Sequence, residues 1–184
     1  MQITNTPIDG LLVIEPKVWI DDRGYFFESY NMQALLAASG YNVPFVQDNQ
    51  ARSIKNVLRG LHYQNLPNPQ AKLIRVLEGA IWDVAVDIRK SSPTYGKWFG
   101  IELSANNKKQ LLIPHGFAHG YSVLTDTAEV FYKCDTFYDK SVETGVYFAD
   151  PTIGVDWKIN LSEAIISEKD QKQPRFNENW NTFE

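Results

Sequence analysis

Hydrophobic and polar residues alternate with a period of two over much of this chain. Residues 80–88 show the pattern most clearly, because Trp82, Val84 and Val86 fall on one side while Asp83 and Asp87 fall on the other. Successive side chains of a β-strand point to opposite faces, so this alternation predicts a strand that is covered on one side. Comparable segments occur at 11–19, 25–30, 43–49, 57–63, 96–103, 110–113, 121–124 and 128–138. Many short strands at roughly even spacing predict a sandwich or barrel.

The segment 32–39 departs from this pattern and predicts a helix. Asn31 can cap its N-terminus, and Gly40 suits the position just after its end. The run Asp21-Asp22-Arg23-Gly24 is a turn signal, so the segments on either side of it are expected to form a hairpin. We therefore expect one all-β domain, 1–184, with one or two short helices and a loosely held tail from about residue 172 to 184.

Two polar side chains lie on apolar faces of predicted strands. Lys72 shares its parity with Ile74 and Val76, and His62 shares a face with Leu58. A buried charge is costly unless it is paired. Two interpretations follow: a hydrogen-bonded core histidine with a lysine that extends to a barrel mouth, or a base and a cation that meet in an apolar cavity. Tyr132 also lies on an apolar face, where the commoner role is a structural hydrogen bond.

Composition narrows the possible functions. The 184 residues are 43% hydrophobic, enough for one full-sized core. A formal net charge of −4 argues against general attraction to nucleic acid or an anionic membrane. Cys134 is the single cysteine, so no internal disulfide is expected. The chain starts without a basic and then apolar leader, and no apolar run approaches the roughly 20 residues needed to span a bilayer, so we expect a cytoplasmic protein.

The remaining histidines lie in one motif. Pro114, Gly116 and His119 have the Pro-x-Gly-x-x-His spacing that is the second signature of cupin jelly rolls. Metal-binding cupins supply a His-x-His pair and a glutamate from their first signature, but here the matching segment is His62-Tyr63-Gln64. A metal would lack ligands at such a site, so we expect no metal and no other cofactor. His115 is assigned no role.

Several motifs in the same order resemble the dTDP-4-dehydrorhamnose 3,5-epimerases, from Arg23 to about Asp170. They are 58–64 (LRGLHYQ), 70–73 (QAKL), 83–89 (DVAVDIR), 92–96 (SPTYG) and the segment 113–120. The resemblance implies a cupin-type β-jelly roll that works without metal as a homodimer. It also implies inversion of C3 and C5 of dTDP-4-dehydro-6-deoxy-D-glucose, in the pathway to dTDP-L-rhamnose.

The resemblance gives the unusual polar residues roles in catalysis. His62 matches the family's base, and Asp170 matches the carboxylate that orients it. Lys72 matches the cation at the enolate oxygen, and Tyr132 matches the acid that protonates the opposite face of the sugar ring. A proton next to a ketone is weakly acidic, so its removal needs such a base and such a cation.

The resemblance also implies substrate-binding positions. Arg23 and Arg59 match residues at the diphosphate and sugar, and Phe26 and Tyr138 are candidates to stack on thymine; without the resemblance, Arg23 and Glu28 could equally form a surface ion pair. Strict alternation would place Arg59 and His62 on opposite faces, so both can reach one substrate only if the strand bulges near Gly60. The full substrate-binding set is Arg23, Phe26, Glu28, Gln47, Asp48, Asn49, Arg59, His119, Tyr138, Glu143 and Lys169.

Two alternatives stay open on the sequence alone. One is an enzyme that epimerises a single carbon, or a ketoisomerase, on a related dTDP-4-keto sugar. The other is a cupin that binds a nucleotide sugar without turning it over.

Overall fold

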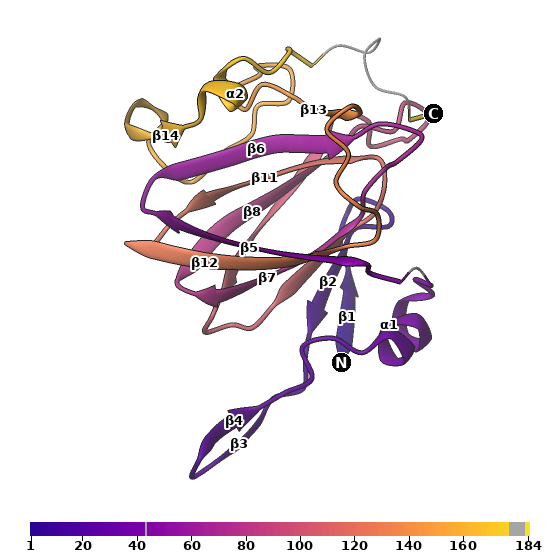
Figure 1. Cartoon of the computed structure of the whole chain (residues 1–184), viewed down its shortest axis with the longest axis vertical. Coiled ribbons are helices and arrows are strands. Elements are labelled where there is room, and N and C mark those ends of the chain that lie inside the picture. The colour runs from indigo at the N-terminus through magenta and orange to yellow at the C-terminus, as the bar shows by residue number, and fades with distance from the viewer. Residues whose placement is uncertain (43, 177–182) are drawn as a thin grey trace.

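The computed structural model describes residues 1–42, 44–176 and 183–184, and it consists of two packed β-sheets (Figure 1). In spatial order, the first sheet contains β1 (Gln2–Asn5), β2 (Leu12–Glu15), β10 (Gln110–Ile113), β7 (Lys72–Glu78), β12 (Thr127–Cys134) and β5 (Gln47–Ile54). The second contains β13 (Glu143–Gly145), β6 (Val57–Gln64), β11 (Phe117–Val123), β8 (Ala80–Asp87) and β9 (Trp98–Ser104), and β14 (Ile165–Ile166) pairs with β6. The expected all-β jelly roll is confirmed.

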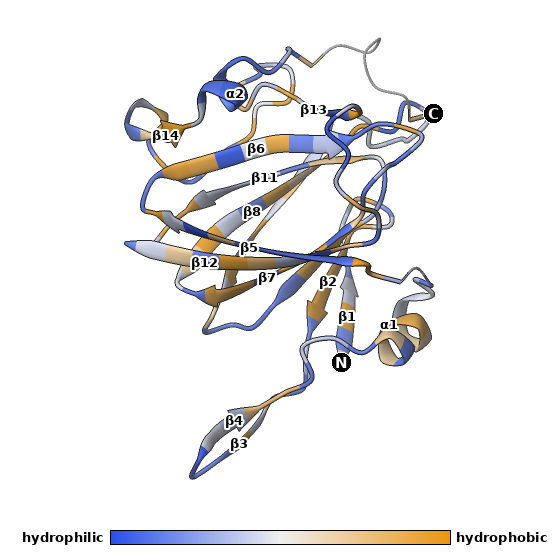
Figure 2. Cartoon of the chain, viewed as in Figure 1, coloured by the Kyte–Doolittle hydropathy of each residue, from blue (hydrophilic) through white to orange (hydrophobic). Residues whose placement is uncertain are grey.

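The predicted helix is confirmed as α1 (Met32–Ser39). The Asn31 side chain accepts a hydrogen bond from the backbone N–H of Ala34 at 3.1 Å, and Gly40 has the left-handed conformation, with φ 74°. Leu35 packs against Ile14 and Leu73 on the outer face of the first sheet. Figure 2 shows the apolar residues of α1 beside the alternating pattern of the strands. The short helices η1 (Leu161–Glu163) and α2 (Glu168–Gln171) lie near the C-terminus.

The predicted hairpin is also present, but it is shorter and separate from the body of the protein. Its strands are β3 (Trp19–Asp21) and β4 (Gly24–Phe26), so the expected strand 11–19 is divided into β2 and β3. The hairpin extends away from both sheets (Figure 1). Ile20, Tyr25 and Phe26 are 82%, 62% and 66% exposed, which is unusual for such apolar side chains.

The expectation that β8 is covered on one side only is wrong. Val84 and Val86 pack beneath Phe148 and Trp157, which come from the C-terminal part of the chain. The opposite face looks into the space between the sheets, where Asp83 is fully buried. The segment that follows β13 covers the second face of β8. The alternation within β8 itself does not predict that a distant segment packs there.

Other boundaries differ from the expected ones because pairing partners, and not local pattern, set strand ends. The expected segments at 43–49 and 121–124 are β5 and β11, which cover 47–54 and 117–123, and β12 ends at Cys134. The short strands β1, β13 and β14 were not expected. In the predicted tail, Pro174 accepts a hydrogen bond from Tyr147 at 2.7 Å and Phe183 is buried, while 177–182 lie outside the described residues.

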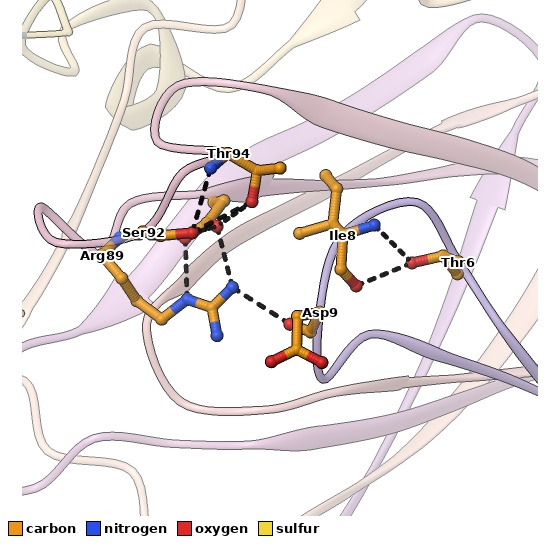
Figure 3. Close-up of polar contacts among 7 residues, drawn as sticks. Thr6, Ile8, Asp9, Arg89, Ser92 and Thr94 are labelled. Atoms are coloured by element: carbon orange, nitrogen blue, oxygen red, sulfur yellow. Dashed lines mark hydrogen bonds and ion pairs between the residues drawn. The ribbon is translucent and has the colours of Figure 1, made fainter.

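A buried carboxylate at the end of β8 fastens the following loop. Asp87 is fully buried and accepts hydrogen bonds from Arg89 Nε at 2.8 Å, Ser92 Oγ at 2.5 Å and Thr94 Oγ1 at 2.6 Å. Arg89 Nη2 also donates to the carbonyl of Asp9 at 3.0 Å (Figure 3). Burial alone would raise the pKa of Asp87, but these donors hold the pKa below its usual value. The cluster therefore joins the loop after β8 to the turn between β1 and β2.

We expect Asp87→Ala to destabilise the fold by about 3–5 kcal/mol, because it leaves the partly buried Arg89 guanidinium without its carboxylate. Urea unfolding should show this as a lower midpoint at unchanged slope. Asp156→Ala is the control, since that carboxylate pairs with Lys158 on the exposed surface. Equal midpoints for the two variants would contradict the account of this cluster.

Apolar side chains from both sheets fill most of the space between them, including Ile74, Val76, Ile81, Val123 and Val130. Beside this core, between β5, β7 and β12 of one sheet and β6 and β11 of the other, the lining becomes polar. No helix in the described ranges is long and apolar enough to cross a membrane.

Candidate active site

The polar region between the sheets is a cavity with two lobes. The first lobe, of about 150 Å³, opens toward the loop after β12, and the second, of about 240 Å³, extends toward Arg59. His62, Lys72 and Tyr132 line both lobes. The predicted inward parity of Lys72 and Tyr132 is thus confirmed, and the two lobes meet at these three side chains.

A shift in strand pairing brings Arg59 and His62 to the same cavity. His62 pairs with His119 and Arg59 pairs with Tyr121, so three steps along β6 match two steps along β11. Gly60 lies in this bulge with φ 123°, and a Cβ there would come within 2.5 Å of the Gly120 Cα atom. Only glycine fits such a close approach. The bulge required by the sequence argument is therefore present, and both side chains line the second lobe.

His62 is held by a buried carboxylate. Its Nε2 lies 2.6 Å from Oδ1 of Asp170, which is 3% exposed. An ionised carboxylate only accepts hydrogen bonds, so the proton of a neutral His62 lies on Nε2. Nδ1 then carries the lone pair that can accept a proton from a bound molecule.

The local fold explains why Asp170 reaches His62 from so far along the chain. Strand β14 adds to β6 at Val57 and Leu58, and Ser167 caps α2 by accepting from the Asp170 N–H at 3.1 Å. The Gly60 N–H donates to the other carboxylate oxygen at 3.2 Å. Burial opposes ionisation of Asp170, but the hydrogen bonds from His62, Gly60 and Ser167 hold its pKa below the usual value. Asp170 is therefore an anion that can stabilise a protonated His62.

Lys72 and Tyr132 complete the centre of the cavity. Lys72 Nζ makes no hydrogen bond or ion pair with any residue that the structure describes, and it lies 6.0 Å from the centroid of the Tyr132 ring. Burial lowers the pKa of Lys72. Burial raises the pKa of Tyr132 to about 12, so its hydroxyl is protonated at neutral pH and can donate a proton. The cavity thus contains a base, a lysine with no hydrogen bond or ion pair to a described residue, and an acid.

A second histidine–carboxylate pair lies beside the first. His119 Nε2 is 2.7 Å from Oδ1 of the fully buried Asp83, and His119 lines the second lobe. Burial lowers the pKa of His119, which favours the neutral imidazole. The other oxygen of Asp83 has no hydrogen-bond partner among the described residues.

The other predicted binding residues divide into four groups. Those that line the cavity are Gln47, Asn49, Tyr138 and Glu143 in the first lobe and Arg59 and His119 in the second. Lys169 reaches the first lobe through an ion pair with Glu143 at 2.6 Å. Asp48 points to the outer face of its sheet, where it pairs with Lys133 at 2.8 Å. Arg23, Phe26 and Glu28 lie on or just after the hairpin and line neither lobe of this chain.

Sequence reasoning missed Gln64, Gln70, Asp83 and Tyr121, which line or support the cavity. The signal for Gln64 was its position at the second ligand site of the cupin motif. Its amide donates to the carbonyls of Asn68 at 2.7 Å and Phe137 at 3.3 Å and accepts from the Asp139 N–H at 2.9 Å, so the side chain is bonded to the loop after β12. Within the described ranges, no three His, Cys, Asp or Glu side chains gather as metal ligands.

His115 lies outside the cavity. Its Nε2 is 2.8 Å from Oδ2 of the buried Asp135, which also accepts from the backbone N–H of Ala71 at 2.7 Å. Asp135 therefore links His115 to the residue just before β7. The pair has the same residue types as His62 and Asp170 but does not line the cavity.

Comparison with known proteins gives consistent matches over nearly the whole chain. The family model for dTDP-4-dehydrorhamnose 3,5-epimerase matches residues 5–178. The dTDP-4-dehydrorhamnose 3,5-epimerase of Shigella flexneri is 50% identical over 176 residues, 96% of each chain.

Solved structures agree in fold. The dTDP-4-dehydrorhamnose 3,5-epimerase from Elizabethkingia anophelis NUHP1 matches with a TM-score of 0.93 and 50% identity, over 96% of each chain. A dTDP-6-deoxy-D-glucose-3,5-epimerase from Legionella pneumophila, in complex with dTDP-4-keto-L-rhamnose, matches with a TM-score of 0.89 and 43% identity, over 96% of this chain and 98% of that one. The chain therefore belongs to the dTDP-4-dehydrorhamnose 3,5-epimerase family.

Proposed function

We propose that this chain inverts C3 and C5 of dTDP-4-dehydro-6-deoxy-D-glucose and so produces dTDP-4-dehydro-L-rhamnose. The family assignment supports the substrate and the reaction. The observation that carries the mechanism is the position of His62 and Tyr132 on opposite sheets, facing one cavity that also holds the unpaired Lys72.

The first half-reaction removes a proton next to the C4 ketone. His62 Nδ1 accepts this proton, and Asp170 stabilises the imidazolium that forms. The electron pair moves onto the ketone oxygen, where the Lys72 ammonium stabilises the negative charge. Lys72 suits this role because no described side chain already neutralises it.

The second half-reaction delivers a proton to the other face of the ring. A single base would return the proton to the face from which it came, and the configuration would not change. Tyr132 belongs to β12 and His62 belongs to β6, so a sugar ring between the sheets has one group on each side. The raised pKa of Tyr132 keeps its proton in place until the enolate has formed.

The product tests this proposal against its alternatives. The purified protein is incubated with dTDP-4-dehydro-6-deoxy-D-glucose, the C4 ketone is reduced with borohydride, and the configuration at C3 and C5 is determined. We expect both centres to be inverted. Inversion of one centre alone would identify a single-site epimerase, and unchanged sugar would identify a binding protein.

The reaction needs no metal in this proposal, because proton transfer and charge stabilisation are both assigned to side chains. Dialysis against a chelator should leave turnover unchanged. Loss of turnover that one divalent metal restores would show that the cavity holds a metal.

We further propose that the protein is a homodimer in which the hairpin completes the neighbouring site. Arg23, whose side chain is 91% exposed, and Phe26 lie far from the cavity of their own chain on an exposed apolar hairpin. Such a surface favours pairing between subunits. Light scattering at micromolar concentration should give the mass of a dimer. A fully active monomer would contradict this proposal.

A further inference from the structure

Tyr138 is an exposed residue in a loop, but its backbone and its hydroxyl are fixed from three directions. It lies between β12 and β13 at the mouth of the first lobe and is 53% exposed. Its backbone N–H donates to Oε1 of Gln47 at 3.0 Å, and its hydroxyl donates to Oε2 of Glu143 at 2.7 Å. These two bonds restrict the orientation of the exposed ring.

Gln64 provides the third constraint. Its Nε2 donates to the carbonyl of Phe137, and its Oε1 accepts from the N–H of Asp139, at 3.3 and 2.9 Å. One side chain therefore holds the residues immediately before and after Tyr138. Gln64 is 3% exposed, and its amide nitrogen also donates to the carbonyl of Asn68 at 2.7 Å, so the side chain makes three hydrogen bonds in a buried position.

The position of Gln64 also connects this loop to the catalytic centre. Gln64 follows His62 by two residues on β6 and pairs with Glu143 on β13. Glu143 in turn bonds both Tyr138 and Lys169, the neighbour of Asp170 in α2. Burial would raise the pKa of Glu143, but Lys169 and Tyr138 hold it below the usual value, so the carboxylate that anchors the ring is ionised.

A ring that is already fixed loses little conformational entropy when a planar base stacks on it. Without the two Gln64 bonds, the residues on either side of Tyr138 would be held by fewer hydrogen bonds, and more of the ordering of the ring would fall to the ligand. We propose that Gln64 is a positioning residue that fixes Tyr138 as a stacking surface for the base of the nucleotide. The inference rests on the proposed function, because it requires a nucleotide as ligand.

A double-mutant cycle with dTDP as the probe tests this inference. Calorimetry measures dTDP affinity for the wild type, Gln64→Leu, Tyr138→Ala and the double variant. A stacked base is worth about 1–3 kcal/mol, so Tyr138→Ala should weaken binding by roughly tenfold. Gln64→Leu should weaken dTDP binding by up to the same factor. When Tyr138 is already alanine, adding Gln64→Leu should not weaken dTDP binding further.

Steady-state kinetics give a second readout. Gln64→Leu should raise KM while kcat stays within about twofold, because the bonds that it removes act on recognition and not on proton transfer. Gln64→Met has a similar length but makes none of the three bonds, so its effect should equal that of the leucine variant, which it replaces if that variant does not fold. Ser122→Ala is the control, since it removes a buried bond to the Trp157 carbonyl outside both lobes and should bind dTDP like the wild type.

Three outcomes would overturn the inference: wild-type affinity in Gln64→Leu, an equal loss in the presence and absence of the Tyr138 ring, or a fall in kcat at unchanged KM. A wild type that binds dTDP but inverts neither carbon would refute the proposed function and leave the binding cycle intact as a test. A wild type that does not bind dTDP would overturn both.

Discussion

Replacing His62 with alanine is expected to lower the rate of proton exchange at the substrate by about 10²–10⁴, the usual contribution of a general base. The His62 imidazole lies where the two lobes meet, and its Nε2 is bonded to the buried, ionised Asp170, which leaves the lone pair on Nδ1 to accept a proton. Exchange is measured by mass spectrometry as deuterium uptake from solvent. Binding of dTDP should be preserved, because the bonds that hold Tyr138 do not involve His62.

Replacing Asp170, the carboxylate that bonds His62, should lower the exchange rate less than replacing His62 itself. Asp170→Asn keeps the size of the side chain but removes the charge that stabilises the imidazolium, so exchange should fall by less than in His62→Ala. His115→Ala is the matched control, because its imidazole also pairs with a buried aspartate, but outside the cavity. Near-normal exchange in His62→Ala would mean that another group is the base.

Replacing Tyr132 with phenylalanine is expected to separate exchange from inversion. His62 and Lys72 remain in place, so the enolate still forms and the substrate still takes up deuterium. Protonation from the far face requires the hydroxyl, so the inverted sugar should form at least about 10² times more slowly. Product configuration and deuterium uptake are measured on the same sample, with a thermal melt to confirm folding.

Tyr41→Phe is the control for loss of a tyrosine hydroxyl, because Tyr41 bonds Asp135 at 3.3 Å outside both lobes. It should retain exchange and inversion. If Tyr132→Phe lost both activities in parallel while folded, the hydroxyl would not be the second acid. If it kept both, protonation would come from another group.

The local sequence pattern predicted features that depend only on neighbouring residues, such as the face of a strand on which a side chain lies. The parity of Lys72 with Ile74 and Val76 predicted that the side chain points inward but left open whether its ammonium stays in the interior or extends to a barrel mouth, and the same parity argument applied to Tyr132 beside Val130. The caps of α1 follow from the preferences of Asn31 and Gly40, so the helix was predicted with its observed bounds.

The local sequence pattern could not predict features that depend on contacts with distant segments of the chain. The bulge near Gly60 lies where β6 passes close to Gly120 of β11, and β8 is buried on both faces because Val146, Phe148 and Trp157 belong to the layer that covers it. The roles of Gln64 and Asp83 depend on partners far away in sequence. Resemblance to the family supplied Asp170 and the binding set, and the structure shows which of these share one cavity.

Deuterium uptake by the wild-type protein tests the central claim most directly. The claim is that one cavity removes a proton on one face and returns a proton on the other, at two carbons next to the same ketone. In deuterated solvent, dTDP-4-dehydro-6-deoxy-D-glucose should acquire two deuterons, at C3 and C5, and the product should be inverted at both carbons. Uptake at one carbon, no uptake, or inversion without uptake would contradict this account.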